Sequence, residues 1–364
     1  MSAPLLPPKQ LLPIRHGRRQ FTHGAFGELA VALWRDNDDI RVVALKTVHD
    51  AKTNNDETEN TELAILRHHL LSHPNIIPLL ASYSDKHGAL SFVFPYCPLD
   101  IQLVLDWRQQ QALPLLSIST IHCIVSDLVE ALDHLHNKCH IVHRDLKPGN
   151  LLVTSEGSIQ LCDFGLASTT STTAATGLCT LHYRPPEILL GHDTAVNSTT
   201  TSPAVDLYSA ACVIAALLTG RTLFPGQTAL DQLARITAVL GSPSPSNAAA
   251  PPAPIATFLP RCLECSPTIH HLLQQWLVLD PTQRTWKPAT VLPALREVSD
   301  DRARLQWELI PETIAEEPFL LPCSDNSDDL AVVCWNEQRT VELASQRRAV
   351  STTKCCSDWR GRLR

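Results

Sequence analysis

Two stretches decide the fold of this chain: His143-Arg-Asp-Leu-Lys-Pro-Gly-Asn150, and Asp163-Phe-Gly165, which begins thirteen residues after Asn150. Transfer of a phosphoryl group needs few covalent participants but several well-placed charges. An acid must lie beside the attacking hydroxyl, and oxygen ligands must hold the metal ions that bind the phosphates. In this order and spacing, the residues indicate such a site rather than unrelated solvated loop side chains.

Four side chains of these stretches match those tasks. Asp145 suits the acid beside the hydroxyl, and Lys147 can reach the transferred phosphate. Asn150 and Asp163 carry oxygen atoms suited to a metal ion. We predict Asp145, Lys147 and Asn150 as catalytic residues, and Asn150 and Asp163 as metal ligands that the intervening strands bring together.

The two stretches resemble the catalytic loop and the metal-binding turn of the eukaryotic protein kinases, and further motifs follow in that family's order between about Arg19 and Leu295. The resemblance implies an α+β fold with two lobes, a small β-rich N-lobe and a larger α-helical C-lobe. It also implies ATP and Mg²⁺ as cofactors and a protein serine or threonine as phosphate acceptor. By the same resemblance, Lys147 in the catalytic loop favours serine and threonine over tyrosine as acceptor.

The nucleotide motifs of that family have counterparts upstream. Val43-Ala-Leu-Lys46 resembles the strand whose lysine holds the α- and β-phosphates, and Glu62 resembles its ion-pair partner, with Glu57 and Glu59 as rivals. Thr22-His-Gly24-Ala-Phe-Gly27-Glu-Leu29 resembles the glycine-rich loop, although an ordinary hairpin turn fits a lone GxxG as well. The resemblance assigns these residues to the nucleotide site: Thr22, Gly24, Gly27, Leu29, Ala44, Lys46, Glu62, Phe94, Pro95, Cys97 and Asp163.

Three of those assignments depart from the family's pattern, and one of them is Leu29, which replaces a valine. Thr22 replaces the first glycine of the loop, where a side chain obstructs the approach of backbone N–H groups to phosphate. Pro95 replaces the hinge acid, so adenine would be held by the backbone carbonyl of Pro95 and the backbone groups of Cys97. An alternative function is therefore a pseudokinase or scaffold that binds nucleotide or a partner without turnover.

A third group of motifs belongs to the scaffold of the family. Thr180-Leu-His-Tyr-Arg-Pro-Pro-Glu187 resembles the TxxYRAPE segment, with His182 in place of the usual tryptophan. By this resemblance Thr180 touches the catalytic aspartate and lysine, and Glu187 pairs with Arg284. Asp206 resembles the buried helix acid that holds the catalytic-loop backbone. The same segment argues against a third alternative, a small-molecule kinase.

Several short strings resemble the cyclin-dependent kinases of the CMGC group: Tyr183-Arg184, Asp206–Cys212, Leu223–Gly226 and Asp231–Ile236. Their cyclin-contacting helix begins with a PSTAIRE-like string, whereas Asn55–Thr61 is acidic and has no apolar anchor. A cyclin partner is compatible with the resemblance but is not supported by a PSTAIRE-like helix. The pattern favours a single-subunit kinase that phosphorylates the activation loops of other cyclin-dependent kinases in cell-cycle control. Thr176 is a candidate phosphorylation site, and its phosphate would pair with Arg144. The alternative is that this Ser/Thr-rich segment is a solvated linker.

Composition excludes several other classes. The chain is 44% hydrophobic and 18% charged, and its net charge of −7 disfavours nucleic acid as a partner. The longest apolar run, Leu207–Leu218, is too short for a membrane span and predicts a buried helix. The N-terminus has prolines where a secretory signal has its apolar region. We expect no membrane partner and a location in the nucleus, the cytoplasm or both.

Cysteine usage agrees with an intracellular location. The 12 cysteines are scattered over 364 residues, so we expect reduced thiols. The one CxxC pair, Cys262 and Cys265, has no second pair at zinc-ligand distance, although His270 and His271 lie nearby. Ordinary buried cysteines are favoured over a metal site there.

The predicted organisation is an arm at 1–18, an N-lobe at 19–97, a C-lobe at 98–298 and a C-terminal extension of unknown role at 299–364. Hydrophobic periodicity predicts these strands: 29–34, 40–46, 90–94, 150–154 and 158–162. It also predicts these helices: 57–71, 117–137, 204–218 and 230–240. The prolines of residues 1–13 predict a loose arm, and these Ser/Thr-rich or Ala/Pro-rich segments predict flexible loops: 168–176, 197–202 and 242–254.

Overall fold

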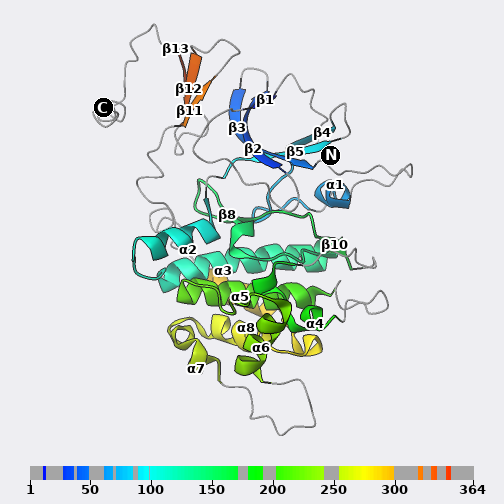
Figure 1. Cartoon of the computed structure of the whole chain (residues 1–364), viewed down its shortest axis with the longest axis vertical. Helices are drawn as coiled ribbons and strands as arrows, with labels where there is room; N and C mark the ends of the chain where they lie inside the picture. Colours follow the sequence, from blue (N-terminus) through cyan, green and yellow to red (C-terminus); the bar gives the residue numbers. More distant parts are fainter. Residues whose placement is uncertain are drawn as a thin grey trace. The chain divides into compact units, whose positions relative to one another are not determined.

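A computed structural model describes residues 11–13, 28–36, 39–48, 61–68, 71–84, 89–97, 99–170, 179–191, 202–241, 254–298, 319–322, 329–333 and 342–345. The chain divides into two compact units (Figure 1). The strand unit comprises Leu5–His49, Ala81–Tyr96 and Glu312–Arg364. The helical unit comprises Met1–Pro4, Asp50–Leu80 and Cys97–Pro311.

A five-stranded antiparallel sheet in the order β1-β2-β3-β5-β4 forms the strand unit's core. Its strands are β1 (Leu11–Pro13), β2 (Glu28–Asp36), β3 (Asp39–Val48), β4 (Ala81–Ser84) and β5 (Leu90–Pro95). Alternate residues such as Val43 and Leu45 on β3 are buried, as the twofold side-chain period of a half-buried strand requires. The predicted hairpin of β2 and β3 and the strand at 90–94 are confirmed.

Two features of this unit differ from the sequence-based expectation. Leu11–Pro13 pairs with Ala32–Trp34, so the prediction of a loose arm is wrong for these three residues. A proline is tolerated because β1 lies at the edge of the sheet, where its missing N–H breaks no ladder. The extension contains a three-stranded antiparallel sheet of β11 (Phe319–Pro322), β12 (Asp329–Val333) and β13 (Glu342–Ser345), for which no element was predicted.

Helices dominate the second unit. They are α1 (Thr61–Leu66), α2 (Ile101–Gln110), α3 (Ile118–Asp133), α4 (Pro186–Leu189), α5 (Pro203–Thr219), α6 (Ala229–Leu240), α7 (Ile255–Phe258), α8 (Pro267–Trp276) and α9 (Pro288–Val298). The prediction of a buried helix at 207–218 is confirmed, because α5 is buried from Ala204 to Leu218. In Figure 1, α3 and α5 run side by side through this unit, and their contacts agree.

Local chemistry sets the ends of these helices. Ser117, Thr228 and Ser266 precede α3, α6 and α8, and each side chain accepts a hydrogen bond from a backbone N–H of the first turn. Gly220 ends α5 with a left-handed φ of 69°, which glycine adopts at little cost. The predicted helix at 117–137 continues past α3 as a π-helical turn, η2 (His134–Cys139).

Short strands and turns of the helical unit carry the candidate site. One sheet joins β6 (Leu99–Asp100), β8 (Leu151–Val153) and β9 (Ile159–Leu161), and another joins β7 (Ile141–Val142) to β10 (Ser168–Thr169). The remaining short turns are η3 (Pro148–Asn150), η4 (Leu181–Tyr183), η6 (Pro260–Glu264) and η7 (Pro281–Gln283). The predicted strands at 150–154 and 158–162 are confirmed as the β8–β9 hairpin.

Two further predictions need correction in this unit. Of the helix predicted at 57–71, the part at 57–60 lies outside the described residues, and α1 ends at Leu66. The chain from Asn75 to Ile77 then bonds to β9. Ser168 and Thr169 pair with β7 rather than forming a loop.

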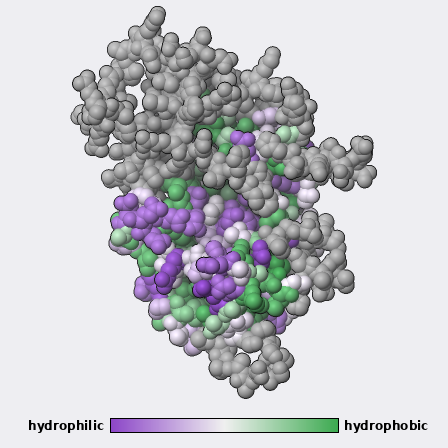
Figure 2. All heavy atoms as spheres, in the orientation of Figure 1, coloured by the Kyte–Doolittle hydropathy of each residue, from purple (hydrophilic) through white to green (hydrophobic). Residues whose placement is uncertain are grey.

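Neither unit offers a transmembrane element in its described part: no helix there is both long and apolar enough to span a bilayer. On the face shown in Figure 2, hydrophilic and hydrophobic residues are interleaved over the helical unit.

Candidate functional site

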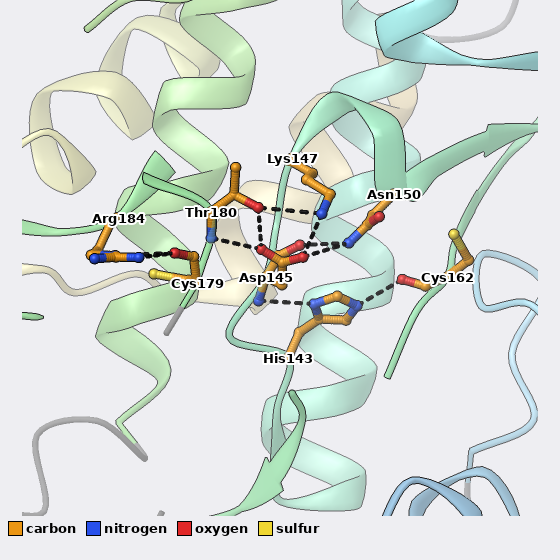
Figure 3. A network of polar contacts seen from close by, with 8 residues as sticks. All are labelled: His143, Asp145, Lys147, Asn150, Cys162, Cys179, Thr180 and Arg184. Carbon is orange, nitrogen blue, oxygen red and sulfur yellow. Dashed lines mark hydrogen bonds and ion pairs between the residues drawn. The ribbon is translucent and has the colours of Figure 1, made fainter. Parts of the chain in front are cut away.

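Asp145 is the centre of a polar network between β7 and η3 (Figure 3). Only 3% of the residue is exposed. Its Oδ2 accepts a hydrogen bond from the Lys147 ammonium at 2.6 Å, and its Oδ1 accepts from the hydroxyl and the backbone N–H of Thr180 at 2.7 and 2.9 Å. The Asn150 amide donates to the Asp145 carbonyl at 2.8 Å and to Oδ2 at 3.3 Å. The network fixes the orientation of the carboxylate.

The same contacts set the charge of Asp145. Burial would raise the pKa of its carboxyl, but the hydrogen bond and the charge of Lys147, together with the hydrogen bonds of Thr180, outweigh burial and lower the pKa below its ordinary value. Asp145 is therefore an anion at neutral pH. Lys147 also donates to the Thr180 hydroxyl at 3.2 Å, and its side chain is 27% exposed. The ammonium thus borders both the carboxylate and solvent.

Asp206 on α5 holds the backbone that precedes Asp145. Its Oδ2 accepts from the N–H of His143 and from the ring Nε2 of His136, and its Oδ1 accepts from the N–H of Arg144, each at 2.8 Å. Arg144 has a left-handed φ of 68°, a strained conformation that these bonds help to hold. Burial would raise the pKa of Asp206, yet its bonds to His136 and His143 lower it. The predicted contact of Asp206 with the loop backbone is confirmed.

His143 joins the Asp145 loop to the Asp163 turn. Its Nε2 bonds to the Cys162 carbonyl at 2.9 Å, so that nitrogen carries the hydrogen, and its Nδ1 accepts from the Asp145 N–H at 3.3 Å. Its ring also meets Phe164 edge-on, with 5.1 Å between the ring centroids. The position of Asp145 is therefore coupled to that of the turn that carries Asp163.

The β8–β9 hairpin brings Asn150 and Asp163 to one end of the site. The Cys162 N–H donates to the Asn150 carbonyl at 3.0 Å, which extends the ladder of the hairpin by one bond. Asn150 directs its amide nitrogen at Asp145, so its amide oxygen is the atom it offers to a metal ion. An amide oxygen and a carboxylate are the hard ligands that Mg²⁺ prefers, so the chemistry of these residues fits that ion.

The segment that contains Thr180 is anchored to the helices beneath it. The Arg184 guanidinium donates twice to the Cys179 carbonyl, at 2.6 and 3.0 Å. Glu187 and Arg284 form a buried bidentate pair at 2.7 and 2.8 Å, and the Arg284 guanidinium lies 4.9 Å from the centre of the Tyr208 ring. The predicted contacts of Thr180 with Asp145 and Lys147, and of Glu187 with Arg284, are confirmed.

A closed circuit of three hydrogen bonds ties the same segment to α6. The His182 ring bonds through Nε2 to the Gly226 carbonyl at 3.1 Å, the Gly226 N–H donates to Gln232 Oε1 at 2.9 Å, and Gln232 Nε2 donates to the His182 carbonyl at 3.1 Å. Gln232 is fully buried, and a Cβ at Gly226 would lie 2.5 Å from Gln232 atoms. His182, which stands where the family usually has tryptophan, therefore helps to fix the Thr180–Tyr183 segment to the start of α6.

The residues predicted to bind nucleotide are divided between the units. In the strand unit, Leu29 lies opposite Lys46 and Ala44 lies opposite Phe94, with Pro95 at the end of β5. Glu62 on α1 is buried in the helical unit, where Cys97 is half-buried, and desolvation of its thiol raises its pKa to about 12. Thr22, Gly24, Gly27 and Thr176 lie outside the described residues. The nucleotide roles and the Lys46–Glu62 pair stay predictions.

Sequence reasoning missed some members of the network. The contacts of Thr180 are predicted above, but the sequence gives no sign that both its backbone N–H and its hydroxyl bond to Asp145. The role of Gln232 carried no sequence signal, because one buried glutamine on an amphipathic helix resembles any other.

The CxxC pair was weighed above as a metal site, and its first cysteine, Cys262, is fully buried in η6. Among the described residues no cluster of three or more His, Cys, Asp or Glu side chains could hold a metal ion.

Comparison with known proteins gives one result on the family. The model of the protein kinase domain matches residues 17–291. The probable serine/threonine-protein kinase glkA of Dictyostelium discoideum is 32% identical over 308 residues, which cover 80% of this chain and 60% of that protein. Cyclin-dependent kinase 4 of Mus musculus is 35% identical over 242 residues, 61% of this chain and 75% of that protein.

A third relative aligns over most of both chains. The mitogen-activated protein kinase homologue NTF6 of Nicotiana tabacum is 30% identical over 339 residues, 86% of this chain and 85% of that protein. By contrast, the chain spans only about three fifths of the amoebal relative. The domain match and these relatives agree with the resemblance of the catalytic loop, the metal-binding turn and the TxxYRAPE-like segment. The chain belongs to the eukaryotic protein kinase family.

Proposed function

We propose that this chain is an active serine/threonine protein kinase of the CMGC type, which transfers the γ-phosphate of ATP to a protein hydroxyl. One observation carries the proposal: Asp145 is held as an anion by its hydrogen bonds with Lys147 and Thr180. The Lys147 side chain is partly exposed, so the site borders solvent. A carboxylate so placed can accept the proton of an incoming hydroxyl.

The proposed reaction balances in a single displacement. The substrate oxygen forms a bond to the γ-phosphorus as the bond from that phosphorus to the ADP oxygen breaks, and the hydroxyl proton passes to Asp145. Lys147 offsets the negative charge on the transferred phosphate. Asn150 and Asp163 would hold Mg²⁺, which neutralises and aligns the phosphates when bound. Lys46 on β3 would hold the α- and β-phosphates.

The test of this function is transfer of labelled phosphate from ATP to a general protein substrate. The purified wild-type chain should incorporate label, and Asp163→Asn should reduce the rate by at least about a hundredfold, because it removes a charged metal ligand. Asp231→Asn is a matched control, since Asp231 is an exposed acid that pairs with Arg235 on α6. Equal incorporation by the wild type and Asp163→Asn would contradict the assignment.

The same experiment addresses the alternative of a pseudokinase, which the substitution of Thr22 for a glycine favours. If the wild type binds ATP but transfers no phosphate, the chain is a binding module. A thermal-shift titration with ATP and Mg²⁺ supplies the binding readout, because a ligand that binds only the folded state raises its melting temperature.

We further propose that the chain needs no cyclin and phosphorylates the activation loops of cyclin-dependent kinases. The support is the acidic, polar string Asn55–Thr61, which offers no apolar anchor to a cyclin. The purified chain alone should phosphorylate an inactive cyclin-dependent kinase on its activation loop. Activity that appears only when a cyclin is added would overturn this part while leaving the kinase assignment intact.

A further inference from the structure

Two adjoining concavities lie between α2 and the end of α5 in the helical unit. Their volumes are about 290 and 280 Å³, and both are lined by Leu105, Gln109, Gly220 and Arg221. One extends to Tyr183, and the other extends to the loop of residues 112–116. Because they share these four residues, the two concavities adjoin each other, and we call them together the α2–α5 groove.

The loop that forms the far end of the groove is held in place by arginine side chains. The Arg108 guanidinium donates to the Pro114 carbonyl from Nη2 at 2.7 Å and from Nε at 3.1 Å. Arg261 donates to the carbonyls of Leu116 and Leu218, which joins the loop to α5. The groove is therefore preformed, so a ligand would lose little free energy in ordering it.

The loop end of the groove and its middle offer different chemistry. At the loop, Leu113 and Leu115 are 39% and 45% exposed, although they are large apolar residues. Where the concavities meet, the exposed guanidinium of Arg221 has no hydrogen-bond or ion-pair partner among the residues that the structure describes. The acid of the groove, Asp106, accepts a hydrogen bond from the Gln102 amide at 2.8 Å. An acidic group and an apolar side chain would complement this lining.

The position of the groove indicates what would carry those groups. Tyr183 lies three residues after Thr180, whose N–H and hydroxyl bond to Asp145. The Tyr183 carbonyl accepts a hydrogen bond from Ser209 of α5 at 2.8 Å, which fixes this end of the groove to the helix below. Because Thr180 contacts Asp145, a polypeptide that presents a hydroxyl to Asp145 passes beside Thr180, and one end of the groove is lined by Tyr183, three residues further along the chain.

We propose that the α2–α5 groove binds an extended segment of the protein substrate that flanks the accepting serine or threonine. An acidic residue of that segment pairs with Arg221, and a large apolar residue packs on Leu113 and Leu115. This inference rests on the proposed function, because it takes the occupant to be the kinase's own substrate. It adds a preference for acidic and apolar flanking residues.

The test uses the full chain and fluorescent peptides with one acceptor serine. Glu, Lys or Ala is placed in turn at each flanking position, and Leu or Ser is placed at the more distant positions. Binding is measured by fluorescence anisotropy without ATP, and KM is measured with ATP. We expect the wild type to bind the best Glu peptide about three- to fivefold more tightly than its Lys counterpart, the range of an exposed ion pair.

Two variants and a control localise the effect. Arg221→Glu should reverse the preference between Glu and Lys peptides. The double variant Leu113→Ser with Leu115→Ser should weaken binding of Leu-containing peptides about five- to tenfold, because a partly buried leucine contact is lost. Leu263→Ser is the matched control, since Leu263 is 65% exposed in η6 and lines neither concavity. Melting temperatures verify that each variant is folded.

Each outcome decides one proposal or the other. Three results would overturn the proposed role of the groove. They are tighter binding of Lys peptides by the wild type, an unchanged preference in Arg221→Glu, and equal losses of affinity in the Leu263 control and the loop variant. If the preference reverses in the binding assay but no peptide is phosphorylated, the groove stands and the proposed function fails. If peptides are phosphorylated with no dependence on flanking residues, the function stands and the groove fails.

Discussion

Two buried aspartates, Asp145 and Asp206, lie in similar surroundings but have different partners. Asp145 is 3% exposed and Asp206 is fully buried, and the pKa of each is lowered in spite of burial. Asp206 accepts from two backbone N–H groups and a buried histidine. Asp145 accepts from Lys147, Thr180 and Asn150, chiefly through their side chains.

The difference in partners separates a structural acid from a chemical one. The bonds of Asp206 fix the path of the main chain at His143 and Arg144, so its loss would release the loop. The bonds of Asp145 fix the direction of a carboxylate beside an ammonium that solvent reaches. Burial and a lowered pKa are therefore common to both roles, and the partner atoms distinguish them.

The largest expected effect on stability is that of Asp206→Ala. It leaves two buried N–H groups without an acceptor, so the free energy of unfolding should fall by about 3 kcal/mol. Chemical denaturation followed by circular dichroism measures the change, with Asp231→Ala on the exposed face of α6 as a control. If Asp206→Ala unfolds at the wild-type denaturant concentration, the contrast between the two aspartates fails.

Lys147→Met tests the chemical side of the comparison. Removing the ammonium should slow phosphate transfer about a hundredfold, the usual cost of one stabilising group in a site. Lys147 lowers the pKa of Asp145, so that pKa should rise in the variant. Activity needs ionised Asp145 and is lost as pH falls through its pKa, so the acid limb of the pH–rate profile should move to higher pH. A limb that does not move would mean that another group titrates there.

His182→Phe tests whether the circuit with Gly226 and Gln232 supports the site from a distance. Loss of one hydrogen bond, about 1 kcal/mol, should lower kcat about fivefold without changing the KM for ATP. His182→Trp, which retains a ring N–H, should restore most of the rate. If His182 acts through Thr180, its effect should be smaller in a Thr180→Ala background, whereas full additivity would show independent action.

His122 on α3 gives the smallest expected effect. Its Nε2 accepts from the Ser266 N–H at 3.1 Å, and burial lowers its pKa, so the folded chain favours neutral imidazole. As pH falls below about 6.5, the unfolded chain takes up the proton first, and stability declines. Unfolding free energies between pH 7.5 and 5.5 should fall less steeply in His122→Gln. Burial also lowers the pKa of His73, so part of the decline in stability with falling pH should remain in His122→Gln.

The resemblance of several motifs to one family predicted much of this arrangement. The Thr180 contacts, the Glu187–Arg284 pair and the Asp206 bonds to the loop, all implied by that resemblance, are confirmed. The sequence did not reveal that Leu11–Pro13 completes a sheet or that α1 ends at Leu66. Those outcomes depend on partners distant in sequence, namely β2 and the bridge from Ile76 to Leu161.

The most direct test of the account is the rate of phosphate transfer by Asp145→Asn per folded molecule, measured with labelled ATP in a single turnover. We expect a loss of about a thousandfold, because the variant cannot accept the hydroxyl proton, with a melting temperature close to that of the wild type. Transfer by Asp145→Asn at the wild-type rate would contradict the role assigned to this carboxylate.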